Sequence, residues 1–161
     1  MKKELKECIE INSNLIKNHI IFEVEGKPFG KQRPKFSRRG RFITTYTPHE
    51  TVEYERKVRE SYRAKYGKYK LRSPVEANII AYYKIPSGTS NVKRKKMLEK
   101  EILPQIKPDT DNIAKAILDP LNRIVYEDDA QVVKLNIEKY YNDKPKVIIE
   151  IKEVWFEYGK Q

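Results

Sequence analysis

Residues 107–120 read KPDTDNIAKAILDP, and this stretch combines a helix signal with a concentration of acidic residues. On a helix from about 111 to 119 the apolar residues share one side: Ile113, Ala116 and Ile117. Residues at every fourth position form a polar row on the opposite side: Asp111, Lys115 and Asp119. Pro120 lacks a backbone donor, so the helix should end or kink there. The stretch therefore predicts a helix that buries one face against a core and displays carboxylates on the other.

Outside this helix, alternating apolar residues predict β-strands, the clearest of which covers residues 75–85. Other strands are expected at 19–24, 132–140 and 146–157, with a hairpin tip near 38–41. A helix should begin at Thr47-Pro48-His49-Glu50, with Thr47 as its N-cap and Pro48 at its first position. It should end before Gly67, with Val52, Val58 and Tyr62 buried. A shorter basic helix is expected at 92–98. The interspersed helices and strands predict an α+β fold, with helices packed against a mixed β-sheet.

A length of 161 residues suits a single domain. We expect this domain to span residues 19–161 and residues 1–18 to form a weak helix or an arm. The single cysteine, Cys8, excludes an internal disulfide and fits a reducing, cytoplasmic setting. Since no apolar run approaches the roughly 20 residues that cross a bilayer, a membrane partner is not expected.

The formal net charge of +11 is concentrated in one half of the chain. Residues 27–72 hold fifteen Lys and Arg against four Glu. Clustered positive charge favours nucleic acid over a solvated basic face that binds nothing. The candidate DNA-binding residues lie in the predicted loop and hairpin: Lys27, Lys31, Arg33, Lys35, Arg38, Arg39 and Arg41. Phe36 and Tyr46 are candidates for stacking on exposed bases, with core packing as the alternative.

Four carboxylates outside the basic segment are candidate metal ligands: Asp109, Asp111, Asp128 and Asp129. Oxygen ligands without His or Cys suit Mg²⁺, with Mn²⁺ as a substitute. The chain has only two histidines, so a zinc site is not expected. The EF-hand pattern fails because Ala114 stands where it requires Gly. The alternative is that these acids are helix caps, and Asp128-Asp129-Ala130-Gln131 has the form of a capping box.

Three separated motifs, in order, resemble the RusA family of Holliday-junction resolvases, which are crossover-junction endodeoxyribonucleases. They are Gly-Lys-Pro-Phe-Gly-Lys-Gln-Arg-Pro at 26–34, Lys-Pro-Asp-Thr-Asp-Asn-Ile-Ala-Lys at 107–115, and Glu-Asp-Asp-Ala-Gln-Val at 127–132. The resemblance covers about residues 19–157. It implies that Asp109, Asp111 and Asp129 bind the metal, with Asp128 a weaker candidate. It also implies that Lys115 is the catalytic lysine, and it leaves the role of Asp119 open.

The resemblance implies a Mg²⁺-dependent endodeoxyribonuclease that resolves four-way DNA junctions by paired symmetric nicks in recombination and repair. It also implies a homodimer, because two symmetric cuts require two copies of a chain with one site. Two other classes remain open from the residues alone. One is a non-catalytic basic DNA-binding protein whose acids are caps. The other is a metal-dependent nuclease that acts on RNA or flap substrates.

Overall fold

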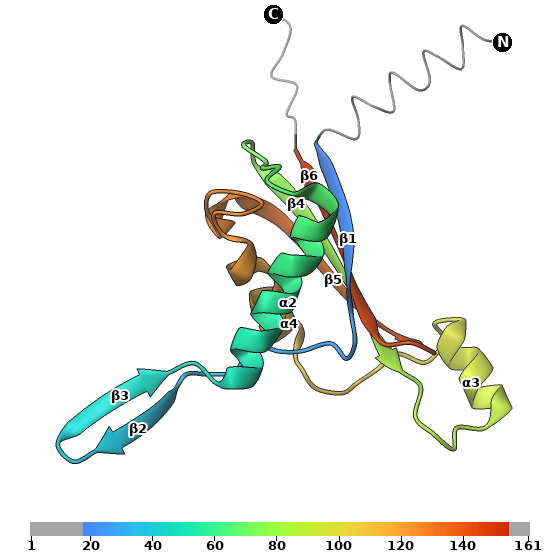
Figure 1. Cartoon of the computed structure of the whole chain (residues 1–161). Coiled ribbons are helices and arrows are strands. Elements are labelled where there is room, and N and C mark those ends of the chain that lie inside the picture. Colours follow the sequence, from blue (N-terminus) through green and yellow to red (C-terminus); the bar gives the residue numbers. More distant parts are fainter. Residues whose placement is uncertain (1–17, 155–161) are drawn as a thin grey trace, which may run out of the picture.

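A computed structural model describes residues 18–154, and four of its strands form one mixed sheet in the order β1-β6-β4-β5 (Figure 1). The strands are β1 (His19–Glu25), β4 (Val75–Lys84), β5 (Val132–Asn142) and β6 (Lys146–Glu153). β6 pairs antiparallel with both β1 and β4, whereas β4 and β5 are parallel. Residues 1–17 of the predicted weak helix or arm, and the end of the strand predicted to reach 157, lie outside the described residues.

Two helices cover one face of this sheet: α2 (His49–Tyr66) and α4 (Thr110–Leu118) (Figure 1). Every second residue of β4 points toward them and is buried: Val75, Ala77, Ile79, Ala81 and Tyr83. The helices contribute side chains to the same core, including Val58, Tyr62, Ile113 and Ile117. The alternate side chains of β4 and the apolar stripes of the two helices thus pack in one core, which confirms the predicted α+β fold.

The start of α2 and one of its buried positions differ from the prediction. Pro48 is the N-cap and no side chain caps the helix, so the capping role expected of Thr47 is wrong. Val52 is exposed, and Thr51 is buried in its place. At the other end Gly67 adopts a φ of 61° and its N–H donates to the Arg63 carbonyl at 2.9 Å. Glycine ends this helix because it accepts positive φ without a steric penalty.

The connection between the parallel strands β4 and β5 carries the remaining helices. It contains α3 (Asn91–Leu98), α4, and two short 3₁₀ turns, η1 (Asp119–Leu121) and η2 (Asp129–Gln131). Pro120 lies within η1, which confirms that the α-helix ends before it. None of the helices in the described part of the chain is long and apolar enough to cross a membrane.

A separate two-stranded hairpin projects from the body of the molecule (Figure 1). It consists of β2 (Lys35–Arg39) and β3 (Phe42–Tyr46), which pair antiparallel. Gly40 at its tip has a φ of 64°. The hairpin lies between β1 and α2 in sequence, next to the N-terminal end of α2.

Candidate active site

The amino-terminal end of α4 carries two exposed carboxylates, Asp109 and Asp111. Asp109 occupies the N-cap position, yet its side chain makes no capping hydrogen bond. An aspartate that served only as a cap would accept from a backbone N–H of the first turn. The capping alternative therefore does not describe Asp109, and its carboxylate is available to an external ligand.

Lys115 lies one turn further along α4, with its Nζ 3.8 Å from Asp111 Oδ2. Both side chains are largely exposed, at 60% for Lys115 and 65% for Asp111. An exposed pair at this spacing contributes little to stability. The pair can therefore separate at low cost when either partner meets a more strongly charged group.

The segment that leads into Asp109 is held by Lys139 of β5. Its ammonium donates to the Ile106 carbonyl and, at 3.1 Å, to the Pro108 carbonyl. Tyr83 of β4 is buried near Asp109, and its hydroxyl has no hydrogen-bond partner within residues 18–154. Burial and the negative charge of Asp109 raise the pKa of Tyr83 to about 12. The phenol is therefore neutral at physiological pH and places no second negative charge beside Asp109.

A loop at residues 26–34 lies directly against this end of α4. The Lys31 N–H donates to the Asn112 carbonyl at 2.9 Å. A Cβ on Gly30 would lie 2.4 Å from Pro108 Cβ, so only glycine allows so close an approach. Phe29 stacks on Tyr54 of α2 with ring centroids 5.1 Å apart. The loop is thus fixed between α2 and α4.

The side chain of Lys31 completes this attachment. Its Nζ lies 2.7 Å from Asp119 Oδ2 and 3.0 Å from Glu55 Oε1, and the side chain is 30% exposed. Burial lowers the pKa of Lys31, but its hydrogen bonds and ion pairs with Asp119 and Glu55 outweigh that effect and raise it above the ordinary value. Asp119 therefore pairs with Lys31, not with Lys115. Lys31 joins the loop to α2 and η1, which is a structural role that the sequence did not indicate.

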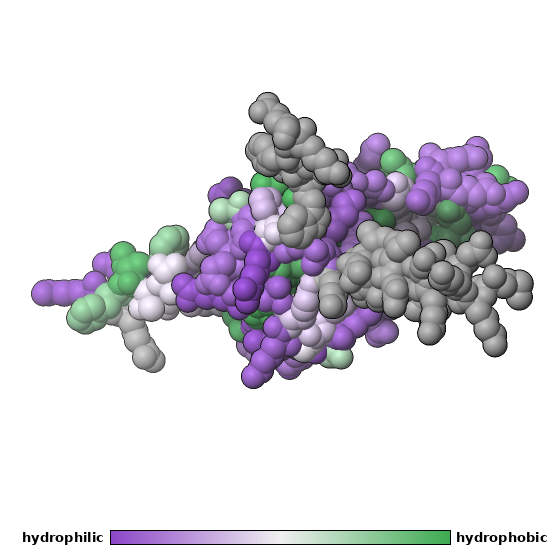
Figure 2. Space-filling view, turned by 90° about the horizontal axis from the view of Figure 1, so that it is seen from above, coloured by the Kyte–Doolittle hydropathy of each residue, from purple (hydrophilic) through white to green (hydrophobic). Residues whose placement is uncertain are grey.

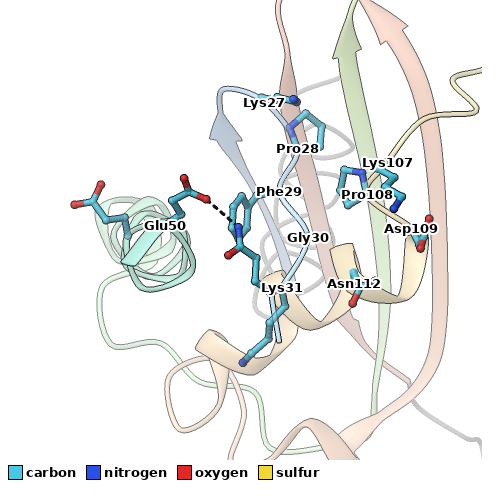
Figure 3. A pocket seen from close by; sticks show the side chains of 12 residues that line it. Lys27, Pro28, Phe29, Gly30, Lys31, Glu50, Lys107, Pro108, Asp109 and Asn112 are labelled. Carbon is cyan, nitrogen blue, oxygen red and sulfur yellow. Dashed lines mark hydrogen bonds between the residues drawn. The ribbon is translucent and has the colours of Figure 1, made fainter. Parts of the chain in front are cut away.

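A groove of about 820 Å³ runs between this loop, α2 and the Lys107–Asp109 segment (Figure 3). Figure 3 shows the loop backbone between Glu50 of α2 on one side and Pro108 and Asp109 on the other. Two exposed lysines, Lys27 and Lys107, line the groove together with the carboxylates of Glu50, Glu53 and Asp109. Cations beside a carboxylate suit a polyanion whose phosphate reaches the acidic end of α4.

The second acidic pair lies in the turn before β5. Asp128 Oδ1 accepts from the Ala130 N–H at 2.9 Å, and the Gln131 side chain accepts from the Asp128 N–H at 3.5 Å. The Gln131 side chain also accepts from the Glu127 N–H at 2.7 Å. This is a capping box, so the capping alternative is confirmed for Asp128. The Asp129 side chain is exposed and makes no hydrogen bond or ion pair with the rest of the described chain.

Tyr126, which precedes this turn in the sequence, links it to α4. The buried phenol donates to the Leu118 carbonyl at 2.8 Å. Burial, together with the charges of Asp129, Asp119 and Asp128, raises its pKa far above the ordinary value. The acidic turn therefore lies near the carboxyl-terminal end of α4, whereas Asp109 and Asp111 lie at its amino-terminal end. The nine residues of this helix span about 13 Å along its axis.

The candidate metal ligands are only partly gathered. Within residues 18–154, no three Asp, Glu, His or Cys side chains lie close enough together to hold a metal ion. The donor chemistry nevertheless suits a hard divalent cation, because the exposed groups at the site are carboxylates. Mg²⁺ commonly uses one or two protein carboxylates and takes its other ligands from water and substrate phosphate. The structure does not bring Asp129 together with Asp109 and Asp111, so their role as one set of metal ligands stays a prediction from the family resemblance.

Comparison with known proteins identifies the family. The family profile described as Endodeoxyribonuclease RusA matches residues 25–152, which include the loop, the groove and both acidic pairs. The chain belongs to the RusA family. It is also 34% identical over 137 residues to the uncharacterized protein YqaN of Bacillus subtilis (strain 168), covering 84% of this chain and 96% of YqaN. Membership of the RusA family implies an endodeoxyribonuclease of the Holliday-junction-resolving kind.

Several supports of this RusA-type site were not predicted from the sequence. Lys139 on β5 and Tyr83 on β4 are distant in sequence from the Asp109 segment that they adjoin, and no local pattern marks them. Gly30 had a signal, since a glycine between two predicted extended segments often marks a close backbone approach. The ion-pair partners of Lys31 had none, because Glu55 and Asp119 are distant from it in sequence.

Proposed function

We propose that this RusA-family protein is a Mg²⁺-dependent endonuclease that resolves four-way DNA junctions by paired symmetric nicks in recombination and repair. The observation that carries the proposal is Asp109. It stands at a helix N-cap without capping, next to a groove that holds Lys27 and Lys107. A carboxylate that does not stabilise its own helix and adjoins a groove with two exposed lysines suits phosphate chemistry.

Asp109, Asp111 and Asp129 would hold the metal, which requires the Asp129 turn to approach the amino-terminal end of α4. Mn²⁺ could replace Mg²⁺ because both prefer oxygen ligands. When bound, the ion would lower the pKa of the attacking water and relieve the negative charge of the phosphate. Asp128 is a weaker candidate for this set, since its carboxylate already accepts a backbone hydrogen bond.

The chain's own residues would act as follows. Lys27 and Lys107 would hold the DNA backbone along the groove. Lys115, whose pair with Asp111 is exposed, would place positive charge where the phosphoryl oxygens become more negative. Lys139 would keep Asp109 in position through its bonds to the preceding carbonyls. The Asp109 carboxylate could then keep one orientation during the reaction.

The remaining candidate phosphate contacts are exposed on the loop and hairpin: Arg33, Lys35, Arg38 and Arg41. Lys31 differs from them, since two carboxylates already neutralise its ammonium. A homodimer would supply the two sites that paired nicks in opposing strands require.

A substrate panel tests this proposal: a mobile four-way junction, a flap, a linear duplex and an RNA hairpin, each with Mg²⁺ and with EDTA. We expect symmetric nicking of the junction in Mg²⁺ and none in EDTA. Junction binding without any nicking in Mg²⁺ or Mn²⁺ would instead establish a non-catalytic binding protein. Faster cleavage of RNA or flaps than of the junction would establish the other nuclease class.

A further inference from the structure

The hairpin arm, residues 33–46, exposes four large apolar side chains. Their exposed fractions are 74% for Phe36, 78% for Phe42, 70% for Ile43 and 48% for Tyr46. In the space-filling view, hydrophobic residues mark the arm that extends to the left of the body (Figure 2). Clustered exposed apolar side chains mark an interaction surface, and a two-stranded hairpin is only marginally stable by itself in water. The arm therefore has the character of a binding element.

The strand register distributes these side chains over both faces of the arm. Arg38 pairs with Ile43, and Lys35 pairs with Tyr46. Side chains of paired residues share a face, and alternate residues along a strand share it too. One face therefore carries Phe36, Arg38 and Ile43, and the other carries Lys35, Phe42 and Tyr46. A ribbon that packs on a protein surface needs one apolar face, whereas apolar side chains on both faces suit insertion between two surfaces.

The charge of the arm selects the kind of partner. Residues 33–46 contain five Lys and Arg and no Asp or Glu. Cations interleaved with aromatic side chains match a nucleic acid, since the cations meet phosphates and the rings stack on bases. A hydrophobic protein partner would have to bury these cations without acidic partners from the arm, which is unfavourable.

We infer that the arm inserts its apolar side chains among the bases at a DNA branch point and thereby distinguishes branched from continuous DNA. The inference rests on the proposed function for the identity of the substrate. In a continuous duplex a wedge must first unstack a base step, whereas stacking is already interrupted where the strands of a junction exchange. The same side chains therefore bind more favourably at a branch.

The base of the arm lies beside the proposed active site. Its first strand follows directly from the loop that lines the groove next to Asp109. The Gln32 side chain donates to Glu50 of α2 at 2.8 Å, which anchors the base of the arm. A junction with one strand in the groove would thus present its centre toward the arm.

The test uses the full chain without divalent metal, so that binding is measured in the absence of cleavage. The variant Phe36→Ala/Phe42→Ala removes one ring from each face. A matched control, Ser37→Ala/Thr44→Ala, changes the same strands without removing apolar surface. Affinity is measured for a four-way junction and for a linear duplex of the same sequence, across a range of salt concentrations. A fluorescent purine analogue is placed either at the branch or within one arm of the junction.

We expect the double phenylalanine variant to lose roughly 5- to 100-fold in junction affinity, as for the loss of one or two base stacks, with an unchanged salt slope. Its duplex affinity should fall much less, and the binding-induced fluorescence change at the branch should disappear. Phe36→Tyr/Phe42→Tyr should restore both, which would exclude simple loss of the hairpin.

Three outcomes would overturn the inference: unchanged junction affinity, an equal loss on duplex and junction, or a change in molar mass that makes the arm an interface between copies of the chain. Since no metal is present, these results are independent of whether the wild-type protein cleaves. A chain that binds through the arm but never nicks in Mg²⁺ would contradict the proposed nuclease alone.

Discussion

The two acidic pairs, Asp109 with Asp111 and Asp128 with Asp129, look alike in sequence but are used differently in the structure. Asp128 accepts a backbone hydrogen bond and closes a capping box. Asp109 occupies the equivalent N-cap position of α4 and makes no such bond. The sequence marked 128–131 as a capping box, and the structure adds that the Asp109 carboxylate makes no capping bond.

The difference lies in what surrounds each pair. The Asp128 turn is stabilised locally, by the Gln131 side chain and by the ion pair between Lys70 and Glu127. The Asp109 turn is stabilised from outside, by Lys139 and by the loop that packs against Pro108. Because its neighbours fix the turn, the Asp109 carboxylate is not needed for capping.

The largest expected effect is on cleavage by Asp109→Asn, Asp111→Asn and Asp129→Asn. Each change removes a charged oxygen ligand, so nicking of a junction should fall by roughly three orders of magnitude or more. Thermal stability in EDTA should be unchanged or higher, since no capping bond is lost at Asp109. Single-turnover cleavage assays and melting curves measure the two effects. Near-normal nicking by Asp111→Asn would contradict the metal-site assignment.

Gly30→Ala tests the external support of the Asp109 turn. The new methyl group would meet Pro108 Cβ at 2.4 Å, so the loop must move away from α4. We expect a loss of about 1–3 kcal/mol in the free energy of unfolding, as for overpacking, together with slower cleavage. Urea unfolding measures the free energy of unfolding, and the junction assay measures the cleavage rate. Gly40→Asn at the hairpin tip is the control, since its surroundings are open and Asn tolerates a φ of 64°. Equal stability of both variants would mean that the close approach at Gly30 is unimportant.

Lys31→Met tests whether this lysine is a support or a DNA contact. It leaves Asp119 and Glu55 without their shared cation, and the partly buried position predicts a loss of about 1–2 kcal/mol. The salt slope of DNA binding should stay the same. Lys35→Met should do the reverse, with unchanged stability and a slope lower by roughly one. A lower slope for Lys31→Met would return this residue to the phosphate-contacting set.

The smallest effect separates the two members of the second acidic pair. Asp128→Ala should cost about 1 kcal/mol in stability through the lost cap, whereas Asp128→Asn should change neither stability nor cleavage, because Asn is an equally good cap. Denaturant unfolding and the junction assay measure both quantities. If Asp128→Asn lowered cleavage as much as Asp129→Asn, the two acidic pairs would not differ in function as proposed.

The sequence by itself determined most helices and strands of this protein and which face of each is apolar. The alternation in β4 and the apolar stripe of α4 place side chains on a fixed face, because strand and helix periods are properties of the local backbone. Helix ends were predicted where glycine or proline acts on the backbone directly, as at Gly67 and Pro120. The start of α2 was misplaced, because a Thr-Pro pair allows either residue to be the cap.

Only the tertiary structure decided the relations between distant residues. Asp119 pairs with Lys31 and not with Lys115. Lys139 bonds to the Pro108 carbonyl just before Asp109, and the Asp128 turn lies near the carboxyl-terminal end of α4. The tertiary structure also left the apolar residues of the hairpin uncovered. A local sequence pattern fixes only the face of a helix or strand on which a residue lies. Ion pairs and burial depend on distances between residues that are far apart in the sequence, so the pattern cannot predict them. The candidate site residues could therefore be predicted from the sequence, whereas their hydrogen-bond and ion-pair partners could be identified only in the tertiary structure.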